Sequence, residues 1–275
     1  MIWILILATW EAAYRFIGWK AWVFPAPSHI FDSLFSLLDI HTAFGEPLHR
    51  GWPWPAGAPG GISTGVIRSP LVEANIVSAV RLIIGFFLSI LLGGTLGVLM
   101  WRFKTLDEFL GPLFLGLQTL PSVCWVPLAI IAFGLTEEAV QFVLVMGSFF
   151  AIAISLRDGL RTIPPLYQRA GMMMGAHGWR LYRYVLLPAS LPALASGLRQ
   201  GFSFAWRSLM GAEFVFIIER HGLGYLLQAG RDFNDVAQVM AIMIVMVVLG
   251  MIADRLAFAK LEQRVYRRFG LAAAR

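Results

Sequence analysis

Residues 169–192 read RAGMMMGAHGWRLYRYVLLPASLP, and this stretch decides how the rest of the chain is interpreted. It is basic and amphipathic, it is predicted to be helical, and it lies between two long apolar segments. A short, tight turn is enough to join two apolar membrane helices. The long basic segment between these two helices therefore predicts a docking surface. Its small residues and its ending have a defined order: Ala170 and Gly171, then Gly175, nine residues, Val185, one residue, and Leu187-Pro188.

The composition predicts a membrane protein. Of the 275 residues, 58% are hydrophobic and 14% are charged, which is too apolar for a soluble globule. A helix needs about 20 residues to cross the ~30 Å of hydrocarbon in a bilayer. Six segments are candidates: 2–18, 76–100, 113–133, 139–156, 193–218 and 236–257. We expect an all-α, polytopic membrane bundle with a core of five transmembrane helices. The first segment adds an N-terminal helix, and because it is short and carries Glu11 and Arg15, the sequence does not decide whether this helix crosses the whole membrane.

The distribution of charge predicts the orientation. Basic residues gather in the 157–188 loop and in the 259–275 tail, whereas the loops at Glu137-Glu138 and at 219–235 are acidic or mixed. Because basic loops stay on the cytoplasmic side, we expect both termini and the 157–188 loop there. The net charge of +6 is therefore explained by membrane topology and not by nucleic-acid binding.

The chain is accordingly divided into an N-terminal transmembrane helix at 1–24, a periplasmic segment at 25–75, a transmembrane domain at 76–258 and a cytoplasmic tail at 259–275. In the periplasmic segment Ser28 is predicted to be the N-cap of an interfacial helix. The glycine- and proline-rich stretch 51–61 follows, with Trp52 and Trp54 as interfacial anchors or as contacts for a substrate or partner.

No residue pattern indicates catalysis or a metal site. The chain has no phosphate-binding glycine loop, and its five histidines lack metal-ligand spacing. Cys124 is the only cysteine and cannot form an internal disulfide. Glycines recur four residues apart at 93/97 and 197/201, which predicts closely packed helices.

A polar stripe on the fifth predicted span is the candidate transport path. Its residues recur at intervals of three or four: Ser196, Arg199, Ser203 and Arg207. Because an arginine inside a membrane costs about 2.5–3.5 kcal/mol on an insertion scale, this face should meet water or the bundle interior. It then forms a positive wall for an anionic solute. Alternatively, Arg199 reaches the cytoplasmic interface and Arg207 pairs with Glu213 or another helix. Glu213 itself is assigned either to an outer gate or to helix pairing.

The order of small residues, glycine and Leu-Pro in the 169–188 loop resembles the cytoplasmic EAA loop of ABC-importer permeases. Arg169 stands where that family usually has glutamate, so an ion pair made by this glutamate in relatives is absent here. Further motifs extend the resemblance to the nitrate/sulfonate/taurine branch: Arg81 with Gly85-Phe86, Leu120-Pro121, Trp125 with Pro127-Leu128, Phe133-Gly134, Gly197-Leu198-Arg199, Ala212-Glu213 and Gly222-Leu223-Gly224.

The resemblance implies a type I importer fold and a loop that couples the permease to an ATPase. The coupling residues that it implies are Arg169, Ala170, Gly171, Gly175, Val185, Leu187 and Pro188, and Trp179 is added to them because its side chain offers apolar contact to a partner. It also implies two permease copies, ATPase subunits that bind ATP and Mg²⁺, and a periplasmic or lipoprotein solute-binding protein at a bacterial inner membrane. This chain itself is expected to bind no cofactor and to catalyse no reaction.

The alternatives are an ion-coupled secondary transporter and a membrane-embedded enzyme. The first would show internal repeats with ionisable residues near the midplane, and no such repeat is found in the sequence. The second would need a convergent set of His, Asp or Glu residues inside the spans. The substrate is not specified by the sequence.

Overall fold

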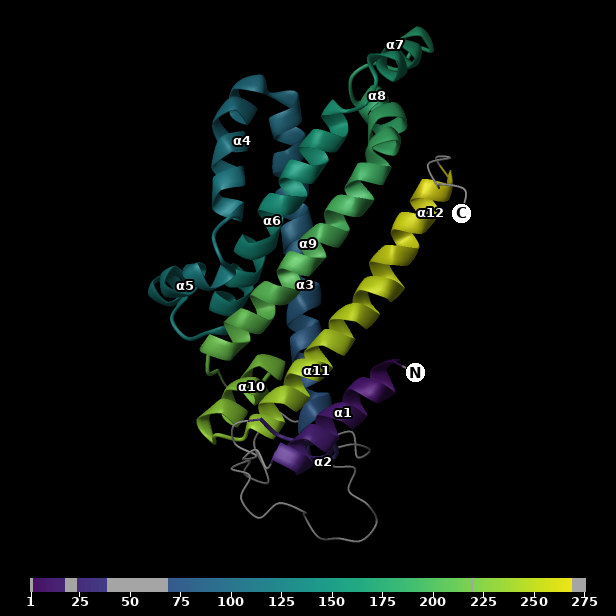
Figure 1. The fold of residues 1–275 in the computed structure, drawn as a ribbon. Helices are drawn as coiled ribbons and strands as arrows, with labels where there is room; N and C mark the ends of the chain where they lie inside the picture. Colours follow the sequence, from purple (N-terminus) through teal and green to yellow (C-terminus); the bar gives the residue numbers. More distant parts are fainter. Residues whose placement is uncertain (1, 18–23, 39–68, 219, 269–275) are drawn as a thin grey trace. The chain divides into compact units, whose positions relative to one another are not determined.

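The computed structural model describes residues 2–17, 24–38, 69–218 and 220–268, and every regular element in these ranges is a helix (Figure 1). The predicted anchors Trp52 and Trp54, with the whole 51–61 stretch, lie outside the described residues. The chain divides into two compact units, 1–80 with 213–248 and 81–212 with 249–275. The helices α3, α9 and α11 each contribute residues to both units.

The unit formed by 1–80 and 213–248 contains the two N-terminal helices and the short helix that precedes the last long one. Its elements are α1 (Ile2–Ile17), α2 (Pro27–Leu38), the start of α3 (Pro70–Arg102), α10 (Leu223–Asp232) and most of α11 (Val236–Ala253). The helix α2 begins at Pro27, one residue before the predicted N-cap, because proline suits a first helical turn. The carboxylate of Glu11 lies 3.3 Å from both the N–H and the hydroxyl of Ser28. Glu11 therefore takes the capping role that was predicted for Ser28.

The unit formed by 81–212 and 249–275 contains the remaining helices. They are the rest of α3, α4 (Lys104–Gln118), the 3₁₀ turn η1 (Ser122–Trp125), α5 (Val126–Phe133), α6 (Glu137–Arg161), α7 (Pro165–Met173), α8 (Trp179–Leu181), the π-helical turn η2 (Tyr182–Leu186), α9 (Leu187–Val215), the π-helical turn η3 (Asp254–Ala259) and α12 (Lys260–Arg268).

Three helices in the described residues are long and apolar enough to cross a membrane: α3, α6 and the continuous helix Val236–Arg267. A fourth candidate is α4 together with η1 and α5, which are bent by 108° relative to each other. The predicted span 113–133 is broken at Pro121, because proline lacks the N–H needed to continue the helix. The helix α1, with 16 residues, is too short, and α9 is long enough but not apolar enough, so neither meets this measure of length and hydropathy.

The core of the second unit is built where α3, α4 and α6 meet. Its buried members are Met100, Phe114, Val145, Phe149, Phe150, Ala153 and Ile154. Glycines permit the close approach that was predicted: a methyl group on Gly93 would lie 2.6 Å from the Phe149 carbonyl oxygen, and one on Gly97 would lie 2.7 Å from that of Ala153. Similarly, Gly201 of α9 lies against Ile152 of α6. This tight packing fixes the end of α6 from which the 157–188 loop departs.

Candidate functional site

The 165–188 segment consists of two helical pieces separated by a double glycine turn. The helix α7 ends at Met173, and the chain then turns at two positions with positive φ, Gly175 at 83° and Gly178 at 53°. The first value is costly for a residue with a Cβ, so glycine is the residue that fits this turn. A new helix begins directly after Gly178 with Trp179.

Two glycines of this segment have different physical roles. No atom lies within 4 Å of the place where Gly175 would carry a Cβ, so this glycine is not needed to let another segment pack closely. Its role is to adopt the positive φ of the turn. Gly171 is buried, and a Cβ there would lie 2.8 Å from Leu181 Cδ1 and 3.0 Å from Val185 Cγ2. Gly171 thus lets α7 pack against the helix that follows the turn.

The outer surface of the segment is apolar and exposed. Met173 is 89% exposed, Met174 is 79% exposed and Trp179 is 71% exposed. Arg169 and Ala170 are also exposed on α7. Methionine side chains adapt to irregular partner surfaces, and an exposed apolar patch rimmed by cations is typical of a protein interface.

The inner surface of the segment is anchored to the ends of the long helices. Leu186 is buried against Leu156, Leu160 and Ile163, and the partly buried Trp101 and Tyr182 pack on the same cluster. The Tyr182 ring lies 6.2 Å from that of Trp101 and 5.3 Å from that of Trp179. Burial of this side chain raises the pKa of the Tyr182 phenol above its ordinary value. The segment is therefore fixed at its base and exposed at its tip.

The helix that leaves the segment begins earlier than the sequence predicted. The fifth candidate span was predicted from residue 193, but helical structure begins at Trp179 and continues through the π-helical turn η2 into α9. Pro188 lacks an N–H, and π-helical turns are one way in which a helix accommodates a missing backbone bond. Val185 belongs to this turn.

The candidate residues of the transport path do not share one environment, as Arg199, Ser203, Arg207 and Glu213 show. Arg199 donates from Nε and Nη2 to both carboxylate oxygens of Asp254, each at 2.7 Å, and from Nη1 to Glu262 at 2.8 Å. This arginine therefore ties α9 to η3 and α12. The two acidic partners were not singled out in the sequence, although Asp254 is the one acid in the predicted span 236–257 and Glu262 is the one acid in the 259–275 tail.

Ser203 and Arg207 lie on the exposed surface of α9. The Ser203 hydroxyl donates to the Arg199 carbonyl oxygen at 3.2 Å, and Arg207 Nε donates to the Ser203 carbonyl oxygen at 3.1 Å. The Arg207 guanidinium also lies 4.7 Å from the centre of the Phe204 ring. These contacts are all within one helix, so the charge of Arg207 remains available to a ligand.

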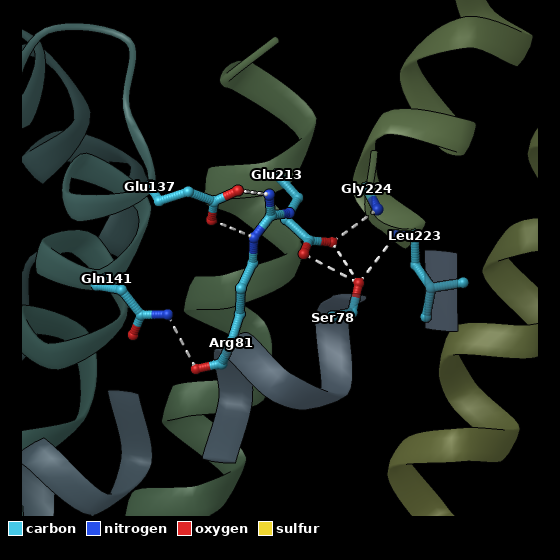
Figure 2. A network of polar contacts seen from close by, with 7 residues as sticks. All are labelled: Ser78, Arg81, Glu137, Gln141, Glu213, Leu223 and Gly224. Atoms are coloured by element: carbon cyan, nitrogen blue, oxygen red, sulfur yellow. Dashed lines mark hydrogen bonds and ion pairs between the residues drawn. The ribbon is translucent and has the colours of Figure 1, made fainter. Parts of the chain in front are cut away.

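Glu213 lies near the end of α9, and its buried carboxylate meets the start of α10 (Figure 2). Its carboxylate accepts hydrogen bonds from the Ser78 hydroxyl at 2.9 and 2.7 Å and from the Gly224 N–H at 3.1 Å. The Ser78 oxygen in turn accepts the Leu223 N–H at 2.9 Å. A carboxylate at a helix N-terminus satisfies unpaired N–H groups and the helix dipole. Glu213 therefore fixes α10 within the unit formed by 1–80 and 213–248.

Arg81, the first residue of the Arg-x-x-x-Gly-Phe motif, forms a two-point ion pair with Glu137 (Figure 2). Nε donates to Oε2 at 2.7 Å and Nη2 donates to Oε1 at 2.6 Å. The Gln141 side chain donates to the Arg81 carbonyl oxygen at 3.2 Å. The sequence placed Glu137 in an acidic loop, whereas the structure uses it to join α3 and α6.

An ionic cluster that the sequence did not reveal lies where α4 and α6 approach the 165–188 segment. Arg157 Nη1 lies 3.3 Å from an Asp107 oxygen, and its Nε donates to Asp158 at 2.8 Å. Arg161 pairs with the other Asp107 oxygen. In the sequence the two arginines could be read only as topology signals, because their acidic partner is about 50 residues away.

Comparison with known proteins assigns this set of features to a family. Residues 85–266 match the model of the binding-protein-dependent transport system inner membrane component. A putative ABC transporter permease of Methanocaldococcus jannaschii is 33% identical over 67% of this chain and 69% of its own length. The bicarbonate transport permease CmpB of Synechococcus elongatus is 28% identical over 70% and 69%, and the taurine transport permease TauC of Escherichia coli is 26% identical over 73% and 72%.

The solved structures include an inward-facing MetNI methionine ABC transporter, to which this chain is similar with a TM-score of 0.60 and 22% identity. The match covers 71% of this chain and 95% of that chain, and at this identity it supports the fold alone. The predicted helical membrane fold is thus confirmed, and so is the resemblance from which it was drawn. The chain belongs to the family of binding-protein-dependent transport system inner membrane components, and it is a permease subunit of an ABC importer.

Proposed function

We propose that this permease moves a small anionic solute inward by alternating access, and that a separate ATPase drives it through the 169–188 loop. The solute class is supported by the relatives, which are named for bicarbonate, nitrate and taurine. Bicarbonate and nitrate are anions, and taurine carries a sulfonate group. The exposed guanidinium of Arg207 on α9 offers the positive charge that such solutes require.

The geometry of the 165–188 segment is the observation that carries the proposal. The segment has a rigid base in the cluster around Leu186 and an exposed tip that contains Met173 and Trp179. Its helix continues without interruption into α9, which carries Arg207. A rigid element of this kind can transmit a movement of an ATPase cleft to the candidate path, because a packed helix moves as one body.

The remaining assignments follow from this arrangement. The 157–188 loop and both termini lie on the cytoplasmic side of the inner membrane, where the ATPase subunits bind ATP and Mg²⁺. A second copy of the permease completes the path, and a solute-binding protein delivers the anion on the other side. Arg169, which replaces the glutamate of many relatives, faces an ATPase surface adapted to a cation.

Reconstitution tests this proposal. Proteoliposomes that contain the chain and its co-expressed ATPase are loaded with ATP and supplied with nitrate, bicarbonate or taurine together with the binding protein. We expect uptake of one of these solutes that requires ATP and that fails in Gly175→Trp, because the bulky residue cannot adopt the turn at φ 83°. Gly116→Trp on α4 is the control, since this glycine also has no neighbour within 4 Å of an added Cβ and lacks a positive φ.

Two results would contradict the proposal. Uptake driven by a proton or sodium gradient without the ATPase would assign the chain to secondary transport. Normal ATPase binding and full transport in Gly175→Trp would show that the loop does not couple the two subunits.

A further inference from the structure

The C-terminal helix α12 presents a stripe of cations that the proposed path and loop do not use. Lys260, Arg264 and Arg267 are exposed, and their spacing of four and three residues places them on one face of the helix. These three side chains form no ion pair with any part of the chain that the structure describes. We call them the α12 stripe.

The opposite face of this helix is held firmly by α9. Glu262 of α12 and Asp254 of η3 both pair with Arg199. One turn before Glu262, the Phe258 ring lies 4.6 Å from that of Phe202 and 5.7 Å from that of Phe86. Because contacts on one side fix the helix, the α12 stripe is directed away from α9 and is presented in a defined orientation.

Helix length places the stripe beyond the lipid headgroups. The continuous helix Val236–Arg267 has 32 residues and is therefore about 48 Å long at 1.5 Å per residue. Its apolar part, α11, has 18 residues and by itself fills most of the ~30 Å of hydrocarbon. At the same rise, Arg264 and Arg267 lie roughly 16 and 21 Å past the end of α11. The headgroup layer is only about 5–8 Å thick, so these two cations extend into the aqueous phase.

The stripe lies at the end of its unit that also carries the proposed coupling segment. Figure 1 shows α7, α8 and α12 toward the same end of the unit formed by 81–212 and 249–275. A protein that binds the exposed tip of the 165–188 segment therefore also approaches α12. A row of exposed cations favours an acidic protein surface, and charges at the rim of an interface mainly raise the rate of association.

We propose that the α12 stripe is a second docking surface of this permease and that it binds an acidic surface of the ATPase subunit. This inference rests on the proposed function, and it adds a contact that lies outside the 169–188 loop. Arg199 is then a positioning residue, because it orients the helix that carries the stripe.

The test compares ATPase affinity in two lipids and at two salt concentrations. The full-length permease is placed in nanodiscs of phosphatidylcholine alone or with phosphatidylglycerol, and binding of the purified ATPase is measured by biolayer interferometry. We expect the triple variant Lys260→Gln/Arg264→Gln/Arg267→Gln to weaken binding on the order of tenfold at about 0.05 M salt in both lipids. At about 1 M salt the difference should disappear, because the Debye length falls to roughly 3 Å.

A matched control is Lys104→Gln, which removes one exposed cation at the start of α4 that pairs with the exposed Glu108 at 3.8 Å. Its affinity should stay within about twofold of wild type. Arg199→Gln should cause part of the loss of ATPase affinity, although the α12 stripe itself is intact, because Arg199 orients α12 through Asp254 and Glu262. Arg199→Lys keeps the positive charge and should cause a smaller loss of affinity.

The possible outcomes distinguish the docking role of the α12 stripe from the coupling role of the 169–188 loop. An effect of the triple variant that appears only with phosphatidylglycerol would identify lipid as the occupant and overturn the inference. Equal affinities of wild type and triple variant at low salt, with Gly175→Trp still defective, would overturn the inference alone. A wild-type permease with no affinity for the ATPase would contradict both.

Discussion

The Arg157 guanidinium lies 3.3 Å from the Asp107 carboxylate, and these two side chains are only 10% and 8% exposed. Arg161 pairs with the second oxygen of the same carboxylate. A methyl group on Gly111, one turn after Asp107, would lie 2.7 Å from Arg157 Nη1, so glycine leaves room for this guanidinium. One buried aspartate thus holds two arginines at the end of α6, next to the segment that is proposed to contact the ATPase.

We predict that Asp107→Asn destabilises the protein strongly, because it leaves a buried guanidinium with only the partly exposed Asp158. The expected cost is about 3 kcal/mol, which corresponds to a loss of several degrees in the midpoint of thermal unfolding. Glu108→Gln is the matched control on the next residue, since it removes only an exposed pair with Lys104 at 3.8 Å. It should cost less than about 1 kcal/mol. Equal midpoints for the two variants in detergent would show that the buried pair is not a structural contact.

The two loop glycines should respond differently to substitution. Gly175→Ala introduces a Cβ at a φ of 83°, whereas Gly175→Asn places a residue that tolerates left-handed backbone better. We expect alanine to cost roughly 1 kcal/mol and asparagine less. Gly171→Leu acts by a different mechanism, since it would separate α7 from Leu181 and Val185. Hydrogen exchange of the 165–181 amides measures all three, and faster exchange in Gly175→Asn than in Gly175→Ala would contradict this account.

Arg207→Ala should reduce uptake of the anionic solute more than it reduces assembly with the ATPase. The reason is that Arg207 contacts only its own helix and the Phe204 ring among the described contacts. Arg231→Ala is the control, because it removes a similar arginine over a ring, 5.7 Å from the centre of Phe214, in a different part of the chain. Transport per assembled complex separates the two roles. A complex of Arg207→Ala that dissociates yet transports normally per complex would make this arginine structural.

Single-cysteine labelling tests the orientation. Cys124 is exposed and must first be replaced by serine. In intact cells a membrane-impermeant maleimide should then leave a cysteine at His177 unlabelled and should label one at Glu138, because the basic loop is expected in the cytoplasm. Lysed cells should show labelling at both positions, which controls for access. The reverse pattern in intact cells would overturn the proposed topology.

Ser78→Ala should loosen α10 without disturbing the rest of the bundle. The variant removes the hydroxyl donor that the two Glu213 carboxylate oxygens share and the acceptor of the Leu223 N–H. Leaving such buried groups unsatisfied costs about 1–3 kcal/mol. Faster hydrogen exchange at 223–226 is the expected result. Ser89→Ala is the control, since its hydroxyl is likewise buried but contacts Gly85 and Ser148 and not α10.

The sequence by itself determined the features that depend on local pattern. Long apolar segments predicted the helical membrane bundle, and the spacing from Gly175 to Leu187-Pro188 indicated the family, because both are readable within a few turns of chain. Pro121 likewise marked the break between α4 and η1, since a missing N–H acts on the nearest turn.

The tertiary structure decided the features that depend on pairing across the chain. Arg199 and Arg207 are both arginines on α9. Arg199 forms ion pairs with Asp254 and Glu262, whereas Arg207 is exposed. Asp107, 50 residues from Arg157, gave no local signal at all. The role of a charged side chain in a helical bundle depends on which side chain lies opposite to it. That partner comes from a helix far away in the sequence, and only the packing of the two helices determines their register.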